Sequence, residues 1–240
     1  MRAASIMLSA EDRAQLEASV AAIEAVASQL LTQAKSPWQA LAFVATLHNN
    51  LDRAAAGAVS PVGPVECRAG CSHCCHSRVE LTDPEALHIA EHVRQWPEDE
   101  RASLVLRLHI QARHHSGDQA PPPLATRPPC AFLADHRCSI YAWRPSTCRK
   151  GHSLSAQACE DQSPTIPQSL DILVRCEALM AGARRAYQNN GLPAAAHELA
   201  QAVLAALQQP GAVADWYQGQ PLLRGTSATD AQDKTPSFGS

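Results

Sequence analysis

The sequence predicts a mainly α fold: a helical protein with an irregular cysteine-rich metal-binding lobe. Two observations predict it. Apolar residues recur at helical spacing on both sides of the middle of the chain, whereas seven of the nine cysteines fall in two short bursts without any helical period. The bursts are rich in turn-forming residues, which favours backbone wrapped around an ion over backbone wrapped around an apolar core.

Residues 1–57 are predicted to form a helical hairpin. Ser9 followed by Asp12 resembles a capping box, and Ser36 with Pro37 provides an N-cap and a first helical residue for a second helix. Most amphipathic stripes are simply core, so we interpret the hairpin as scaffold or as a dimer surface. The apolar stripes comprise Leu16, Val20, Ile23, Ala27, Leu30 and Leu31 in the first helix and Leu41, Val44, Leu47 and Leu51 in the second.

Residues 58–160 are predicted to form a cysteine-cluster domain that contains a helical insertion (84–115) and a Pro-rich loop (116–129). Thr82 and Pro84 mark the start of the first inserted helix, and the loop has the composition of a semi-rigid spacer. The inserted helices have candidate buried residues at Leu87, Ile89, Ala90, Val93, Leu104, Val105, Leu108 and Ile110.

Residues 161–217 are predicted to hold the C-terminal helices. One spans about 167–187, and Pro193 opens the next. Cys176 lies on the apolar face of the first of these helices, which indicates a small buried hydrophobe. The stretch 218–240 is polar and rich in Ser, Thr, Gln and Gly, and we predict a disordered tail.

The remaining eight cysteines predict a metal site. Thiolates bind zinc or iron at about 2.3 Å, so the ligands must converge from a tight knuckle and from a second segment that folds back on it. The odd number of cysteines and the lack of an apolar secretory segment argue against disulfides, and inert buried thiols are the third alternative. The candidate ligands are Cys67, Cys71, Cys74 and Cys75 in the first burst, Cys130, Cys138 and Cys148 in the second, and Cys159 beyond both.

These residues carry a family resemblance. The run C-R-A-G-C-S-H-C-C, followed by P-C-A-F-L-A-D-H-R-C-S-I-Y-A-W-R-P-S-T-C-R, resembles the bacterial YkgJ-like cysteine-cluster (CxxCxxCC) family of zinc- or iron-chelating proteins. The resemblance covers roughly residues 67–150. Two departures stand out: three residues separate Cys67 from Cys71 where the family has two, and Ala131 stands where the family commonly has proline. The resemblance implies zinc or an iron–sulfur cluster, and one branch of the family carries the motif inside flagellin lysine N-methylases.

Eight thiols allow several arrangements. They could form two four-cysteine sites, one such site plus a second in which His73 or His76 replaces a thiolate, or a cluster with unused neighbours. Adjacent Cys74 and Cys75 point in different directions in most backbone conformations, so each could serve a different site. The cofactor is therefore predicted to be zinc or iron, including a 4Fe–4S cluster, because soft thiolate sites accept both metals.

Thiolate sites are anionic and need nearby cations or amide donors. We predict that Arg144 and Arg149, with Tyr141 packed beside them, supply this second layer. A further pattern, H-I-A-E-H at residues 88–92, fits the inverted zinc-protease motif. With eleven histidines in the chain such a match arises easily by chance, so we interpret it as a solvated helix face.

Composition limits the functional classes. The net charge of −3 and the pI near 6.4 make nucleic acid an unlikely partner, and no stretch approaches the roughly 18 apolar residues of a membrane span. We expect a cytoplasmic protein that binds a metal ion and could have a protein partner. Phosphate-binding loops, nucleophile elbows and dinucleotide fingerprints are absent from the sequence. Three classes remain: a zinc-stabilised structural or interaction module, an iron–sulfur oxidoreductase, and a methylase-like enzyme that uses the metal or cluster.

Overall fold

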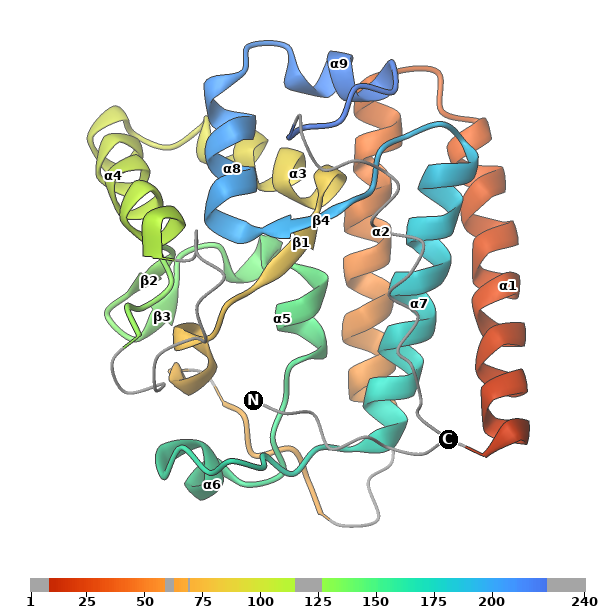
Figure 1. The fold of residues 1–240 in the computed structure, drawn as a ribbon, viewed down its shortest axis with the longest axis vertical. Coiled ribbons are helices and arrows are strands. Elements are labelled where there is room, and N and C mark those ends of the chain that lie inside the picture. The colour runs from red at the N-terminus through yellow and green to blue at the C-terminus, as the bar shows by residue number, and fades with distance from the viewer. Residues whose placement is uncertain (1–8, 59–62, 69, 115–126, 224–240) are drawn as a thin grey trace.

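The computed structural model describes residues 9–58, 63–68, 70–114 and 127–223, and the fold within them is mainly helical, as predicted (Figure 1). Most of the predicted Pro-rich loop and the tail from residue 224 lie outside the described residues. In chain order the elements are α1 (Ala10–Thr32), α2 (Pro37–Ala56), η1 (His73–His76), β1 (Glu80–Thr82), α3 (Asp83–Val93), α4 (Glu98–His114), β2 (Leu133–Ala134), β3 (Arg137–Cys138), η3 (Tyr141–Trp143), α5 (Ser146–Lys150), α6 (Ala156–Glu160), α7 (Leu170–Asn189), β4 (Ala196–Glu198), α8 (Leu199–Gln208) and α9 (Ala212–Tyr217).

The first two helices begin where the sequence predicts, but they do not pair as a simple hairpin. Ser9 and Asp12 form the capping box of α1, and Ser36 caps α2. Helix α7 lies between α1 and α2, and the contact of α1 with α7 is the most extensive between described elements (Figure 1). A side chain at Gly182 would place its Cβ 2.7 Å from Ile23, so glycine permits the close approach of α7 to α1.

The helices predicted as an insertion belong to the main core. Helices α3 and α4 both pack against α8, and α3 also contacts α2. The expected residues Leu87, Ile89 and Leu104 are fully buried there, whereas Ile110 lies on the outer face of α4 and is 46 % exposed. The segment is therefore one layer of the fold (Figure 1).

A short antiparallel strand pair, β1 with β4, joins this layer to the C-terminal part of the chain. Leu81 pairs with His197 in its register. Beside it, buried Asp83 accepts hydrogen bonds from His197 Nε2 at 3.1 Å and from the backbone N–H of Leu222 at 3.1 Å. Leu222 is itself buried, so the part of the expected tail between residues 218 and 223 packs on the fold.

Two further predictions can be compared with the structure. Cys176 is fully buried in a small apolar cluster between α2 and α7, which confirms its assignment as a core residue. Within the described ranges, no helix combines the length and the apolar character that crossing a bilayer requires.

Candidate metal centre

The first cysteine burst folds as a knuckle of consecutive tight turns. The N–H of Cys71 donates to Arg68 O at 3.0 Å, and the N–H of Cys75 donates to Ser72 O at 2.9 Å as η1 begins. Gly70, with φ of 86°, occupies the left-handed region that glycine tolerates. This backbone brings Cys71, Cys74 and Cys75 into one compact turn.

The second burst begins with a hairpin that brings its first two cysteines together. Strands β2 and β3 are joined by Asp135 and His136, both with positive φ (48° and 59°), as a two-residue type I′ turn requires. In the register Leu133 lies opposite Cys138, and the Leu133 N–H donates to Cys130 O at 2.8 Å. The Cys130 N–H in turn donates to Cys75 O at 2.7 Å, which joins the two bursts directly.

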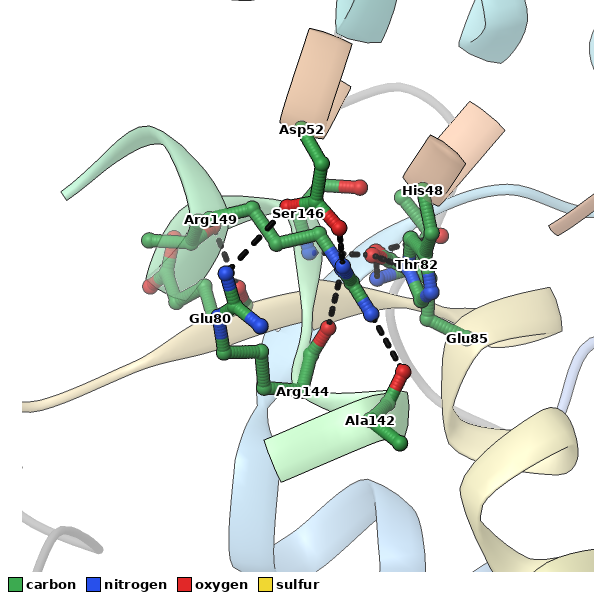
Figure 2. A network of polar contacts seen from close by, with 10 residues as sticks. His48, Asp52, Glu80, Thr82, Glu85, Ala142, Arg144, Ser146 and Arg149 are labelled. Atoms are coloured by element: carbon green, nitrogen blue, oxygen red, sulfur yellow. Dashed lines mark hydrogen bonds and ion pairs between the residues drawn. The ribbon is translucent and has the colours of Figure 1, made fainter. Parts of the chain in front are cut away.

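Cys148 lies on the short helix α5. Hydrogen bonds with Glu85 and with the backbone of Glu80 attach this helix to the core (Figure 2). The N–H of Ser146 donates to Glu85 Oε1 at 2.6 Å, and Thr147 Oγ1 donates to Glu80 O at 2.8 Å. Glu85 also accepts hydrogen bonds from His48 Nε2 at 3.2 Å and from Thr82 at 3.0 Å. Burial raises the pKa of Glu85, but these hydrogen bonds outweigh it and lower the pKa to about 2.

The predicted second-layer residues converge on one carboxylate of α2. Arg144 donates to Asp52 at 3.2 Å, and Arg149 forms an ion pair with the same side chain and donates to backbone carbonyls within 142–144 (Figure 2). The Arg144 guanidinium lies 4.1 Å from the centre of the Tyr141 ring. Both arginines therefore fasten the 141–149 segment to α2. Burial raises the pKa of Cys138, and the charge of Arg144 opposes that rise.

Cys67 lies in an irregular segment just before the knuckle, and Cys159 lies on the short helix α6. The N–H of Ser153 donates to Cys67 Sγ at 3.3 Å, and the N–H of Glu66 donates to Ser153 O at 3.0 Å. The Glu66 carboxylate accepts the N–H of Ala156 at 2.6 Å, at the start of α6. Helix α6, which carries Cys159, contacts η1. All eight predicted ligands thus come from chain segments that meet in one lobe.

The thiols of this lobe affect one another's pKa in two overlapping sets that share Cys74. Burial is the largest cause of the raised pKa of Cys67, and the charges of Cys71, Cys74 and Cys159 also raise it. Around Cys130 and Cys148, burial is again the largest cause of a raised pKa, to about 11 for Cys130, and neighbouring thiols add to it. We call Cys67, Cys71, Cys74 and Cys159 the outer group and Cys75, Cys130, Cys138 and Cys148 the inner group.

The adjacent pair Cys74–Cys75 connects the two groups. A hydrogen bond from the Cys75 thiol lowers the pKa of Cys74 to about 6, and the same bond raises the pKa of Cys75. The charge of Cys74 also acts on Cys130 and Cys148. Of the two adjacent thiols, Cys74 is therefore the one that forms a thiolate more readily.

The donor set fits a soft metal by its chemistry: eight free thiols, with Ser153 N–H and Arg144 positioned to offset thiolate charge. Among the described residues, no three donor side chains surround a common metal position.

The histidines near the lobe have other contacts. His76 Nδ1 donates to Arg127 O at 3.2 Å, and the charge of His76 helps to lower the pKa of Cys74. Of the H-I-A-E-H residues, Glu91 pairs with Arg94 and His92 stacks on Trp143 with ring centres 4.1 Å apart. His88 is half-buried beside His92, rather than on a solvated helix face as expected, and burial lowers its pKa to about 4.

Sequence reasoning missed the residues that hold the cysteine segments in place. Glu85 and Asp52 belong to helices α3 and α2 and carry no metal-site signal. The Thr82–Glu85 capping box was visible in the sequence, because Glu85 stands three residues after Thr82. The contact of Glu85 with Ser146 joins residues 61 positions apart and could come only from the fold.

Comparison with known proteins finds one similar family. Residues 66–167, less than half of the chain, match the family model CxxCxxCC, whose description is "Putative zinc- or iron-chelating domain". Residues 66–167 are therefore similar to this family. The match confirms the resemblance seen in the sequence and extends the similar stretch past residue 150, so that it also includes Cys159. No curated protein and no solved structure matches the chain.

Proposed function

We propose that this cysteine-rich lobe binds zinc or iron in two neighbouring four-thiolate sites, one formed by the outer group and one by the inner group. The observation that carries the proposal is that four chain segments with eight free thiols meet in one lobe, joined by backbone contacts such as Cys130 N–H to Cys75 O. Cys74 would serve the outer site and Cys75 the inner site. The free thiols suit a reducing compartment such as the cytoplasm.

The chemistry of the donors supports zinc or iron and an anionic centre. Four thiolates around Zn²⁺ carry a net charge of −2, and a thiolate-bound cluster is likewise anionic. In the inner group, Arg144 provides positive charge near Cys138. In the outer group, the Ser153 N–H donates to Cys67. Four thiolates around one ion leave no open coordination position, so zinc in such a site would be structural or carried.

The test is an ultraviolet–visible spectrum with elemental analysis on protein purified without oxygen or added metal. Colourless protein with about two equivalents of zinc supports two zinc sites, whereas absorption near roughly 400 nm with iron and sulfide supports iron–sulfur clusters. Protein that retains neither metal, and does not take one up after reduction, would refute the proposal.

The assignment to two sites has its own test. Cys75→Ser should remove the metal of the inner group and reduce a two-site stoichiometry to about one equivalent. Cys176→Ala is the matched control, because Cys176 lies in the helical core outside both groups. Unchanged stoichiometry in Cys75→Ser would refute the assignment while leaving metal binding intact.

A further inference from the structure

We propose that Gln111 is a positioning residue for the inner group: its side-chain amide, held by Glu198, fixes the backbone beside Cys130. This inference rests on the proposed function, since the position of Cys130 matters only if Cys130 is a ligand. Neither residue belongs to a cysteine segment. Gln111 lies on α4, and Glu198 is the N-cap of α8.

The contacts form a continuous chain from the helical core to the cysteine lobe. The Ala131 N–H donates to Gln111 Oε1 at 2.6 Å, and Gln111 Nε2 donates to Glu198 Oε1 at 3.2 Å. Gln111 is 3 % exposed and Glu198 is 2 % exposed, so water does not compete for these bonds. Helix α4 holds Ala131 a second time, because Arg107 Nε donates to Ala131 O at 2.9 Å.

The chemistry of this chain selects an amide at position 111. The side chain must accept a backbone N–H through one atom and donate to a carboxylate through another, which glutamine does and neither glutamate nor methionine does. Glu198 is fixed in turn, because its Oε2 accepts the N–H of Gln201 at the start of α8. The orientation of the Gln111 amide is therefore determined by its two partners.

A shift of Ala131 would move Cys130 relative to Cys75 and to the hairpin that carries Cys138. Cys130 directly precedes Ala131, and its N–H donates to Cys75 O at 2.7 Å. On the other side, Cys130 O accepts the Leu133 N–H at the start of the hairpin that carries Cys138. Gln111 thus influences the spacing of Cys75, Cys130 and Cys138. Its side-chain amide bonds to Ala131 and Glu198 and to none of these thiols.

The test uses the full chain and four variants. Gln111→Glu places two carboxylates together in a buried position, and Gln111→Met removes both hydrogen bonds. The double variant Gln111→Glu/Glu198→Gln exchanges amide and carboxylate, which allows the three hydrogen bonds with Ala131, between the two side chains and with Gln201 to form again. Gln15→Glu is the matched control, because Gln15 is exposed on α1.

Two readouts are measured for each variant. The first is zinc affinity by competition with a chromophoric chelator. The second is the rate at which iodoacetamide alkylates Cys130 relative to exposed Cys67 in the metal-free protein, mapped by mass spectrometry. We expect Gln111→Glu and Gln111→Met to weaken zinc binding about 10- to 100-fold, the usual effect of losing a residue that orients a ligand. Both should also raise the Cys130:Cys67 alkylation ratio, while the double variant and Gln15→Glu should match wild type.

The outcomes separate the two proposals. Wild-type protein that binds no zinc or iron refutes the proposed function, and the alkylation ratio then still tests the positioning of Cys130. Wild-type zinc affinity and alkylation ratio in Gln111→Glu and Gln111→Met overturn the positioning role. If the single variants do not fold, the double variant decides: wild-type values support the role, and values that remain defective overturn it.

Discussion

The inner and outer cysteine groups differ in what holds them. The inner segments are fastened to the helical core by buried side chains: Glu85 holds α5, and Gln111 holds the backbone beside Cys130. The outer segments are held mainly by one another, through Glu66 and Ser153. The helical core therefore positions the inner segments, whereas the outer segments depend on contacts between loops.

The difference predicts two roles for a bound metal. An inner site whose segments are already in place loses little conformational entropy when the metal arrives. An outer site must order its own loops, so metal binding and local folding are coupled there. Four experiments can break or sharpen this contrast.

The largest effect is expected from removing the carboxylate that holds α5. Glu85→Ala leaves the N–H groups of Ser146 and Thr82 and the ring of His48 without their buried acceptor, and should cost about 3–5 kcal/mol of unfolding free energy. The matched variant Glu66→Ala removes one exposed acceptor in the outer group and should cost about 1 kcal/mol. Chemical denaturation of the metal-free variants measures both. Equal losses would contradict the contrast.

The pH dependence of stability should report the same carboxylate. The pKa of Glu85 falls from an ordinary 4.5 to about 2, so its stabilisation is complete above pH 4.5 and is lost as the pH falls towards 2. The shift corresponds to about 3 kcal/mol. Acid titration of the metal-free protein, followed by circular dichroism, should show this loss in wild type and a flatter curve in Glu85→Gln. Identical curves would rule out Glu85 as its source.

Local signals predicted much of the helical part. The caps at Ser9, Ser36 and Thr82 can be recognised from neighbouring residues in the sequence, and the helices start at these caps. Pairing between distant segments was not predictable in this way. Helix α7 lies between α1 and α2, and the strands β1 and β4 have three residues each, too few to show an alternating pattern.

In the candidate site, too, local sequence predicts some features and contacts between distant segments decide the others. The spacing of the cysteines predicts a set of metal ligands, and the structure brings the segments that carry them into one lobe. Their division into inner and outer groups depends on contacts such as Cys130 N–H to Cys75 O, between residues far apart in the sequence. The arginines were predicted as partners of the thiolates, yet both bind Asp52, because a buried guanidinium takes the carboxylate that the fold places beside it.

Metal removal should loosen the two groups unequally. After chelation, amide hydrogen exchange should accelerate by roughly tenfold or more in residues 63–68, 70–74 and 151–160, which corresponds to about 1.4 kcal/mol of local stability. Residues 130–149 should change less, because the core holds them. Exchange measured by mass spectrometry on loaded and metal-free protein makes this comparison. Uniform acceleration across both ranges would mean that the inner segments are not prebuilt.

The smallest effect concerns a hydroxyl beside Glu85. Ser146 Oγ is buried and has no hydrogen-bond partner among the described residues, and a cavity of about 30 Å³ lies next to it. Ser146→Ala keeps the backbone N–H that binds Glu85 and removes an unpaired polar group, so it should stabilise the metal-free protein by about 1 kcal/mol. Thermal unfolding measures the sign. Destabilisation would instead mean that an ordered water fills the cavity and bonds to the hydroxyl, and that the inner group is held by solvent as well as by side chains.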